Sequence, residues 1–308
     1  MLKKLCLGIC LLANGLHLAA QLQSPDQFLP HALGDNFTPH HLLVDYFEHV
    51  AANSEWVQLQ PYGYTNEDRP LMVAFISTPE NLSRLEAIRE NNLRRAGLLE
   101  GKVDPNLNVG VVWLSYSVHG NEAAGSESSM GVVYELSNPD NQSTKAWLEN
   151  TVVVMDPAIN PDGYSRYTHW YRRYTNKITN PNRAVREHDE PWPGGRVNHY
   201  MFDLNRDWAW QTQVESQQRM ALYRQWYPQI HADLHEQFYN DPYYFAPAAR
   251  PYHEYITEWQ TKFQTEIGKN HAKYFDEQGW LYFTKEVFDL LYPSYGDTYP
   301  MFSGAIGM

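Results

Sequence analysis

An apolar run that ends in polar side chains occupies positions 109–122, which read VGVVWLSYSVHGNE. Its β-branched and aromatic residues are typical of a buried strand over Val109–Ser117. His119 and Glu122 follow directly, in the loop where an α/β sheet binds its ligands. An imidazole and a carboxylate three residues apart can both turn toward one Zn²⁺ ion. The stretch therefore indicates a metal site, although so short a pattern also occurs by chance.

Outward from this stretch, strand-like and helix-like patterns alternate. Apolar or aromatic runs predict further strands over Leu71–Ser77, Thr151–Met155, Ile230–His235 and Tyr243–Ala246. Helical spacing of apolar residues predicts helices over Leu42–Ala52, Ser83–Ala96, Ala123–Leu136, Thr212–Trp226 and His253–Gln278. This alternation is typical of an α/β sheet covered by helices.

Composition limits the classes of protein that the chain could be. Its 308 residues carry a net charge of −12, which argues against a nucleic acid or an anionic membrane surface as partner. With 43% hydrophobic and 14% aromatic residues, the chain can bury one large core. We expect a single catalytic domain over residues 46–308, preceded by an extension at 21–45.

The first 20 residues resemble a secretory signal peptide. Lys3 and Lys4 precede an apolar run at 5–13, and the small residues Ala19 and Ala20 suit a cleavage site. We therefore expect a secreted or periplasmic protein with no membrane anchor after cleavage. The only cysteines, at positions 6 and 10, would be removed, which excludes disulfides and thiol catalysis.

A further metal ligand is predicted in the strand at 230–235. Residues two apart on a strand share a face, so His231, Asp233 and His235 point the same way. Of the two histidines, His235 lies nearer the strand end and is the better candidate ligand. A solvent-facing edge strand would give the same alternation.

Polar side chains also gather at residues 203–208, DLNRDW. Asp203 could accept the second imidazole N–H of a metal-bound histidine. The planar guanidinium of Arg206 suits a carboxylate held by two hydrogen bonds, and Asn205 can add another. A surface turn with ion pairs is the competing interpretation.

Four short motifs in order resemble the zinc carboxypeptidases of the carboxypeptidase A type. They are HGNE at 119–122, NPDG at 160–163, DLNR at 203–206 and DLH at 233–235. The turn GYTNEDRPL at 63–71 also resembles the start of the catalytic domain in that family. The resemblance covers about Tyr46 to Met308.

The resemblance implies a three-layer α/β/α fold with a mixed, mostly parallel sheet of about eight strands. It implies an enzyme that binds one zinc ion and hydrolyses the C-terminal bond of peptides that carry a free carboxylate. Separately, we expect a monomer. The residues that match the family's motifs are His119, Glu122 and His235 as zinc ligands, Asn205 and Arg206 for the substrate carboxylate, and Asp203 as partner of His119.

Three further roles are less well fixed by position. The arginine that polarises the scissile carbonyl should follow the NPDG turn, and Arg166, Arg172 and Arg173 all qualify, with Arg166 ranked first. The substrate-capping tyrosine should lie in the loop 292–300, with Tyr295 as the chosen candidate beside its neighbours at 292 and 299. The family's general base follows that loop, whereas Glu286 precedes it. We therefore expect the base beyond Met308, in a sequence truncated there.

Two other functions remain open at this point. An amidase or deacylase acting on cell-wall peptides or acyl amino acids could use the same metal site. Arg206 argues against it, because only substrates with a free carboxylate require that side chain. A binding module that keeps zinc but lacks the base is the other alternative.

Overall fold

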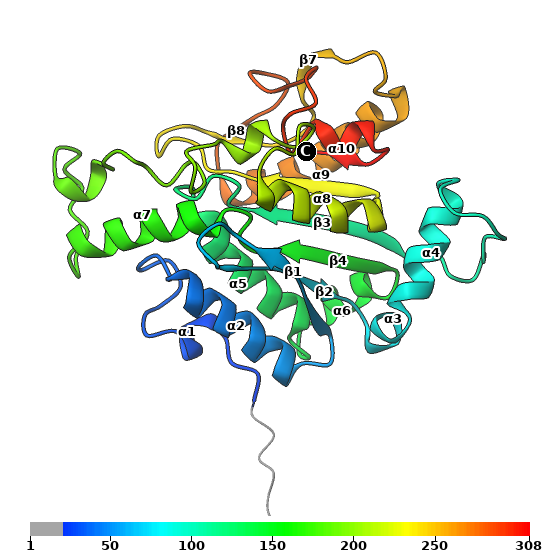
Figure 1. Ribbon diagram of the computed structural model, residues 1–308, viewed down its shortest axis with the longest axis horizontal. Helices are drawn as coiled ribbons and strands as arrows, with labels where there is room; N and C mark the ends of the chain where they lie inside the picture. The colour runs from blue at the N-terminus through cyan, green and yellow to red at the C-terminus, as the bar shows by residue number, and fades with distance from the viewer. Residues whose placement is uncertain (1–20) are drawn as a thin grey trace, which may run out of the picture.

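One mixed sheet runs through the middle of the molecule in the computed structural model, which describes residues 21–308 (Figure 1). Its six strands are β1 (Val57–Tyr64), β2 (Pro70–Ile76), β3 (Gly110–Tyr116), β4 (Thr151–Asp156), β5 (Ile230–Leu234) and β10 (Ile306–Gly307). They lie in the order β1-β2-β4-β3-β5-β10. The first two neighbouring pairs are antiparallel and the other three are parallel. The predicted α/β class is confirmed, with six strands in the main sheet of the described residues. The signal peptide prediction, with its two cysteines, lies outside them.

Helices cover both faces of this sheet. They are α1 (Pro25–Phe28), α2 (His40–Asn53), α3 (Pro79–Ser83), α4 (Leu85–Arg95), α5 (Ala124–Ser137), α6 (Gln142–Leu148), α7 (Pro161–Tyr174), α8 (Val214–Trp226), α9 (Glu258–Gln278) and α10 (Tyr299–Phe302). Two 3₁₀ turns are η1 (Arg186–His188) and η2 (Leu204–Arg206). α2 and α5 pack together on one side of the sheet, and α8 with α9 lies on the other (Figure 1). None of the helices in residues 21–308 is long and apolar enough to cross a membrane.

The central strands are apolar on both faces because each face meets a helical layer. In β3, Val111 and Trp113 join the core beneath α8, where Met220 and Tyr223 also lie. The alternate residue Tyr116 belongs to the core beneath α2 and α5. This double burial is typical of a strand in the middle of a parallel sheet.

The carboxyl ends of the parallel strands bring the predicted motifs to one edge. β4 pairs with β3 on one side and β5 pairs with β3 on the other. The order in which strands are added to the sheet therefore reverses at β3. Ligands bind at such a reversal in open α/β sheets. His119 follows β3, Asn160 follows β4 and His235 follows β5.

Outside the main sheet, four short strands form two parallel pairs. They are β6 (Tyr243–Tyr244) with β8 (Tyr282–Phe283), and β7 (Ala249–Tyr252) with β9 (Asp289–Leu290). The helix predicted from His253 begins at Glu258 instead, because the Thr257 side chain accepts a hydrogen bond from the Gln260 N–H and caps it.

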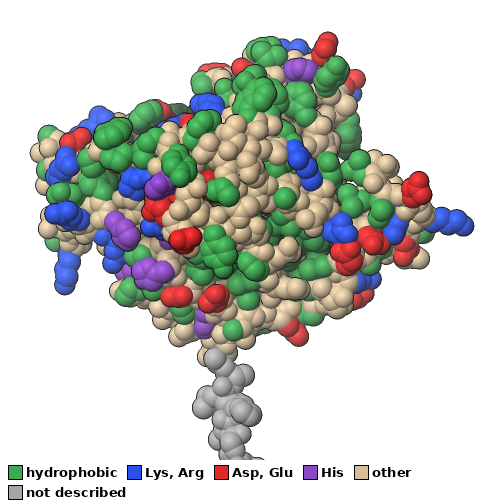
Figure 2. All heavy atoms as spheres, in the orientation of Figure 1, with side chains coloured by type: hydrophobic (Ala, Val, Ile, Leu, Met, Phe, Trp, Pro, Cys, Tyr) green, Lys and Arg blue, Asp and Glu red, His purple; other side chains and the backbone are tan. Residues whose placement is uncertain are grey.

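Charged side chains are unevenly spread over the surface. On the face in Figure 2, Lys and Arg side chains lie mainly toward its two ends, near α7 and α4, with acidic and apolar groups between them. This face carries no continuous basic surface of the kind that nucleic-acid binding requires.

Candidate metal centre

Three potential metal ligands meet at the carboxyl edge of the sheet. His119, Glu122 and His235 each offer one ligand atom, and these atoms lie within 4.8 Å of one another. The Nδ1 atom of His119 is 2.7 Å from Glu122 Oε1, and Nδ1 of His235 is 2.9 Å from Glu122 Oε2. Two imidazole nitrogens and a carboxylate, open to solvent on one side, are a donor set that fits a catalytic zinc ion.

The charge state of the two carboxylates at this centre favours a cation. Burial alone would raise the pKa of Glu122, but hydrogen bonds from His119 and His235 outweigh it and hold that pKa well below its usual value. Asp203 behaves in the same way: burial is the largest effect and would raise its pKa, but the bond from His119 Nε2 at 3.1 Å and the charges of His119, Arg196 and Arg206 together lower it. Asp203 therefore contacts the imidazole nitrogen that faces away from Glu122, as predicted from the sequence.

Three glycines allow the backbones of the motifs to touch. A Cβ on Gly120 would lie 2.1 Å from the Tyr164 nitrogen, and one on Gly163 would lie 2.2 Å from the Gly195 oxygen. A Cβ on Gly195 would in turn approach the Gly163 oxygen at 2.6 Å. No side chain fits at any of these positions, so the loop at 194–198 packs directly against the HGNE and NPDG turns.

This packing places Arg196 beside the metal ligands. Its Nε and Nη2 atoms lie 3.1 and 3.0 Å from Asp203 Oδ2, and Nη1 lies 3.6 Å from Glu122 Oε1. The side chain is 44% exposed, so the guanidinium also faces the solvent side of the centre. Sequence reasoning missed Arg196 because it considered only arginines soon after the NPDG turn. The Gly194-Gly195 pair before it was the available signal.

The structure does not place Arg166 or Arg172 at the metal centre, contrary to the prediction from sequence. Arg166, on α7, donates to the carbonyl oxygens of Gly194 at 2.8 Å and Asn198 at 3.2 Å. Arg172 donates to the Phe37 carbonyl. Arg166 thus holds the backbone on both sides of Arg196.

The predicted carboxylate-binding residues lie next to the predicted tyrosine. Asn205 and Arg206 belong to η2, and the Arg206 guanidinium lies 4.7 Å from the centre of the Tyr295 ring. The Asn205 Oδ1 atom accepts a hydrogen bond from the Gly296 N–H at 2.9 Å, which ties the tyrosine-bearing loop to η2. Arg206 is 47% exposed and so is accessible to a ligand.

Two other predicted motifs contact each other and support the centre. In the turn at 63–71, Thr65 Oγ1 and Arg69 Nη1 donate to Asp162 Oδ1 of the NPDG motif at 2.6 and 2.7 Å. Asp162 is fully buried at the first turn of α7. Its role in this structure is to join β1 and β2 to α7.

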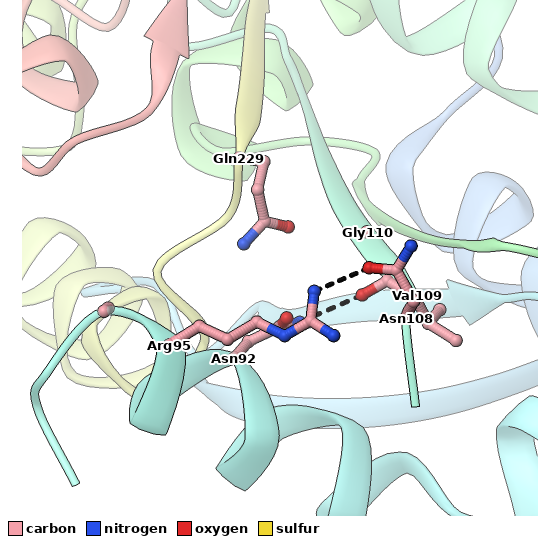
Figure 3. Close-up of a pocket in the computed structure, with 7 residues that line it drawn as sticks. Asn92, Arg95, Asn108, Val109, Gly110 and Gln229 are labelled. Atoms are coloured by element: carbon pink, nitrogen blue, oxygen red, sulfur yellow. Dashed lines mark hydrogen bonds between the residues drawn. The ribbon is translucent and has the colours of Figure 1, made fainter. Parts of the chain in front are cut away.

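A cavity of about 340 Å³ lies at the opposite edge of the sheet (Figure 3). Its polar side chains are already engaged with the protein: Arg95 donates to Asn108, Asn92 donates to the Val109 carbonyl, and Gln229 accepts from the Val111 N–H. These bonds brace the start of β3, and the cavity contains none of the metal-centre residues.

Comparison with known proteins agrees with this architecture. A family model described as zinc carboxypeptidase matches residues 43–275, so the chain belongs to that family. A curated relative, carboxypeptidase 2 of Trichophyton equinum, is 22% identical over 227 residues, which cover 72% of this chain and 34% of that protein. The chain thus spans about a third of the length of the curated relatives that it matches.

Solved structures share the fold at low identity. The carboxypeptidase A of Helicoverpa armigera superposes with a TM-score of 0.58 at 16% identity, over 88% of this chain and 63% of that one. A metallo-carboxypeptidase of Burkholderia cenocepacia gives 0.56 at 16% identity, over 84% and 56%. One from Pseudomonas aeruginosa, in complex with (2-guanidinoethylmercapto)succinic acid, gives 0.57 at 13% identity, over 87% and 57%.

Proposed function

We propose that the protein is a zinc-dependent carboxypeptidase that removes the C-terminal residue of peptides. The observation that carries the proposal is the position of the ligand set His119, Glu122 and His235 next to a guanidinium that can hold a carboxylate, Arg206. Family membership supports peptide hydrolysis, and the free guanidinium face supports a terminal carboxylate rather than an amide as the group recognised.

The protein's own residues divide the work in this proposal. Arg206 and Asn205 bind the terminal carboxylate, and Tyr295 covers it from the adjoining loop. Arg196 takes the role first given to Arg166, because its guanidinium is the one that reaches the metal ligands, and it stabilises the charge that develops on the carbonyl oxygen. Zinc, when bound, would supply a Lewis acid and lower the pKa of water.

We also propose that Glu286 does not act as the general base. It is exposed in the loop between β8 and β9, and it precedes the tyrosine-bearing loop that the family's base follows. Loss of peptide hydrolysis in Glu286→Gln would contradict this proposal.

Carboxylate recognition can be tested by binding, independently of turnover. The zinc-loaded protein should bind (2-guanidinoethylmercapto)succinic acid, and Arg206→Ala should weaken that binding by about 2 to 5 kcal/mol, the range for removing one partner of a desolvated charge pair. The matched control is Arg250→Ala, which removes another exposed arginine that lies over a tyrosine ring, at 5.1 Å, outside the centre. Equal affinity in Arg206→Ala, or equal cleavage of amidated peptides, would favour the amidase.

We further propose that the protein is exported and acts as a monomer. The positively charged start and apolar run at 3–13 support export. Mass spectrometry of protein recovered from the periplasm or the medium should find a chain that begins at Gln21. An intact Met1 would contradict export, and a dimer mass in solution scattering would contradict the monomer.

A further inference from the structure

Each imidazole of the metal centre lies between Glu122 and a second carboxylate, and Nε2 of His235 also lies 3.3 Å from Asn205 Nδ2. In each, Nδ1 faces Glu122 and Nε2 faces a second carboxylate: Asp203 for His119 at 3.1 Å, and Asp233 for His235 at 2.8 Å. The family resemblance implies the Asp203 contact with His119, whereas no role has been given to Asp233. We propose that Asp233 is a positioning residue that fixes Nδ1 of His235 as the atom presented to the metal. The inference rests on the proposed zinc site.

Asp233 is placed by the strand itself. It lies on β5 two residues before His235, so both side chains project from the same face. Its backbone N–H donates to the Met308 carbonyl at 2.8 Å, which holds β5 against the last strand. The position of the carboxylate relative to the imidazole is therefore set by regular backbone structure.

The carboxylate of Asp233 has little other purpose in the described structure. Its side chain is 1% exposed, Oδ2 contacts His235, and Oδ1 has no hydrogen-bond partner among residues 21–308. A buried carboxylate with so few partners is costly unless positive charge lies nearby. A cation held by His235 would supply that charge.

A glycine in the tyrosine-bearing loop makes room for this contact. A Cβ on Gly296 would lie 2.2 Å from Asp233 Oδ2 and 2.9 Å from Cζ2 of Trp208. The φ angle of Gly296 is not in the left-handed region, so the position requires glycine for space rather than for backbone conformation. The same glycine donates its N–H to Asn205, and the loop that carries Tyr295 is thereby joined to Asp233 as well as to η2.

The chemistry of imidazole explains what the contact does. A carboxylate beside Nε2 accepts a hydrogen bond from Nε2–H, which keeps the proton on Nε2 and leaves the Nδ1 lone pair free for a metal. An amide at position 233 could present its NH₂ group instead, which favours the tautomer with the proton on Nδ1. Loss of such a partner typically weakens metal binding about 10- to 100-fold.

The test compares two buried carboxylates in the full-length protein. Asp233→Asn should weaken zinc binding about 10- to 100-fold in competition with a chromophoric chelator, change the visible spectrum of the cobalt-substituted protein, and shift the ¹⁵N resonances of His235 toward the Nδ1–H tautomer. Asp207→Asn is the control: Asp207 is fully buried and accepts from the Thr212 and Gln213 N–H groups, so the change should lower stability and leave zinc affinity intact.

A second pair of variants keeps the inference testable if Asp233→Asn does not fold. Gly296→Ala should also weaken zinc binding, whereas Gly110→Ala, whose Cβ would meet nothing closer than 3.9 Å, should not. Wild-type protein that binds no stoichiometric zinc would overturn the proposed function and this inference together. Normal zinc binding by wild type, with affinity in Asp233→Asn or Gly296→Ala unchanged within about twofold, would overturn this inference alone.

Discussion

Arg196 and Arg166 act on the same loop from opposite sides, and replacing them one at a time should separate transition-state binding from stability. Arg196→Ala removes a guanidinium that is 44% exposed and paired with Asp203. Exposed ion pairs contribute about 0 to 1 kcal/mol, so the free energy of unfolding should change little. A donor to the carbonyl oxygen contributes about 2.7 to 4 kcal/mol to transition-state stabilisation, so a tetrahedral phosphonate analogue should bind about 10² to 10³ times more weakly.

Arg166→Ala should instead lower the free energy of unfolding. The guanidinium holds the carbonyls of Gly194 and Asn198 at 2.8 and 3.2 Å. A hydrogen bond to a charged group contributes about 1.5 to 3 kcal/mol, and two such bonds in one loop are not additive, so we expect a loss of about 2 to 4 kcal/mol in the free energy of unfolding. Zinc affinity should be unchanged, since Arg166 touches no ligand.

Calorimetric titration with a phosphonate peptide analogue and urea unfolding of the same variants would measure both effects. Arg173→Ala, an exposed change on the same helix, is the control and should alter neither quantity by more than about 0.5 kcal/mol. The reasoning would be refuted if Arg166→Ala lost phosphonate affinity at unchanged stability while Arg196→Ala bound it normally.

Three other predictions follow from the same contacts. Chelating zinc should lower the free energy of unfolding by about 2.7 kcal/mol relative to protein at a free zinc concentration of 100 Kd. A free energy of unfolding that does not depend on zinc would contradict the site. Gly163→Ala should destabilise the protein by about 1 to 3 kcal/mol or more, because its Cβ would meet the Gly195 oxygen at 2.2 Å; a neutral result in urea unfolding would contradict the packing. Burial raises the pKa of Asp156 to about 7, so the folded protein keeps a proton that the unfolded chain releases near pH 4. The stabilisation by protonated Asp156 is complete below about pH 4 and is lost as the pH rises to about 7, which lowers the free energy of unfolding by up to about 4 kcal/mol. Asp156→Asn should flatten this dependence of stability on pH.

The central strands could be predicted closely because their local pattern and their final environment coincide. The strands expected at 109–117, 151–155 and 230–235 are observed at 110–116, 151–156 and 230–234. β3 and β4 lie between two helical layers and read as nearly continuous apolar runs. β5 reads IHADL and was predicted from its alternation instead. The motif residues follow these strands directly, and their position at one edge of the sheet was therefore predictable too.

Two elements near the centre were missed for local reasons. β1, which reads VQLQPYGY, lies at the edge of the sheet and is mostly half-exposed, so it has no apolar run to indicate a strand, and the sequence predicts only the turn at 63–71 there. α7 begins inside the NPDG motif, where Asn160 accepts from the Gly163 N–H and Pro161 occupies the first turn. These are ordinary helix-start signals, but the motif was considered only as a turn.

Arg196 was missed for a different reason: the Gly194-Gly195 pair before it indicates close packing but does not identify the partner. Its place at the centre depends on Gly120, Gly163 and Gly195 meeting through their backbones, and these residues come from the HGNE turn, the first turn of α7 and the loop at 194–198. A glycine in a sequence indicates flexibility or a close backbone contact, but it does not indicate which residue makes that contact. Only the assembled sheet brings these three segments to one edge and thereby places Arg196 beside the proposed ligands.

The strand at 230–235 shows the same limit on a smaller scale. Alternation predicts that His231, Asp233 and His235 share a face, but it does not indicate how deeply each side chain is buried. His231 is fully buried and packs against the rings of Trp208 and Tyr223, while His235 is partly exposed at the strand end. The side chain of Asp233, between them, is almost fully buried and yet reaches His235. One face therefore provides a core residue, the proposed positioning residue and the proposed metal ligand in succession, and the order is set by the distance of each residue from the edge of the sheet.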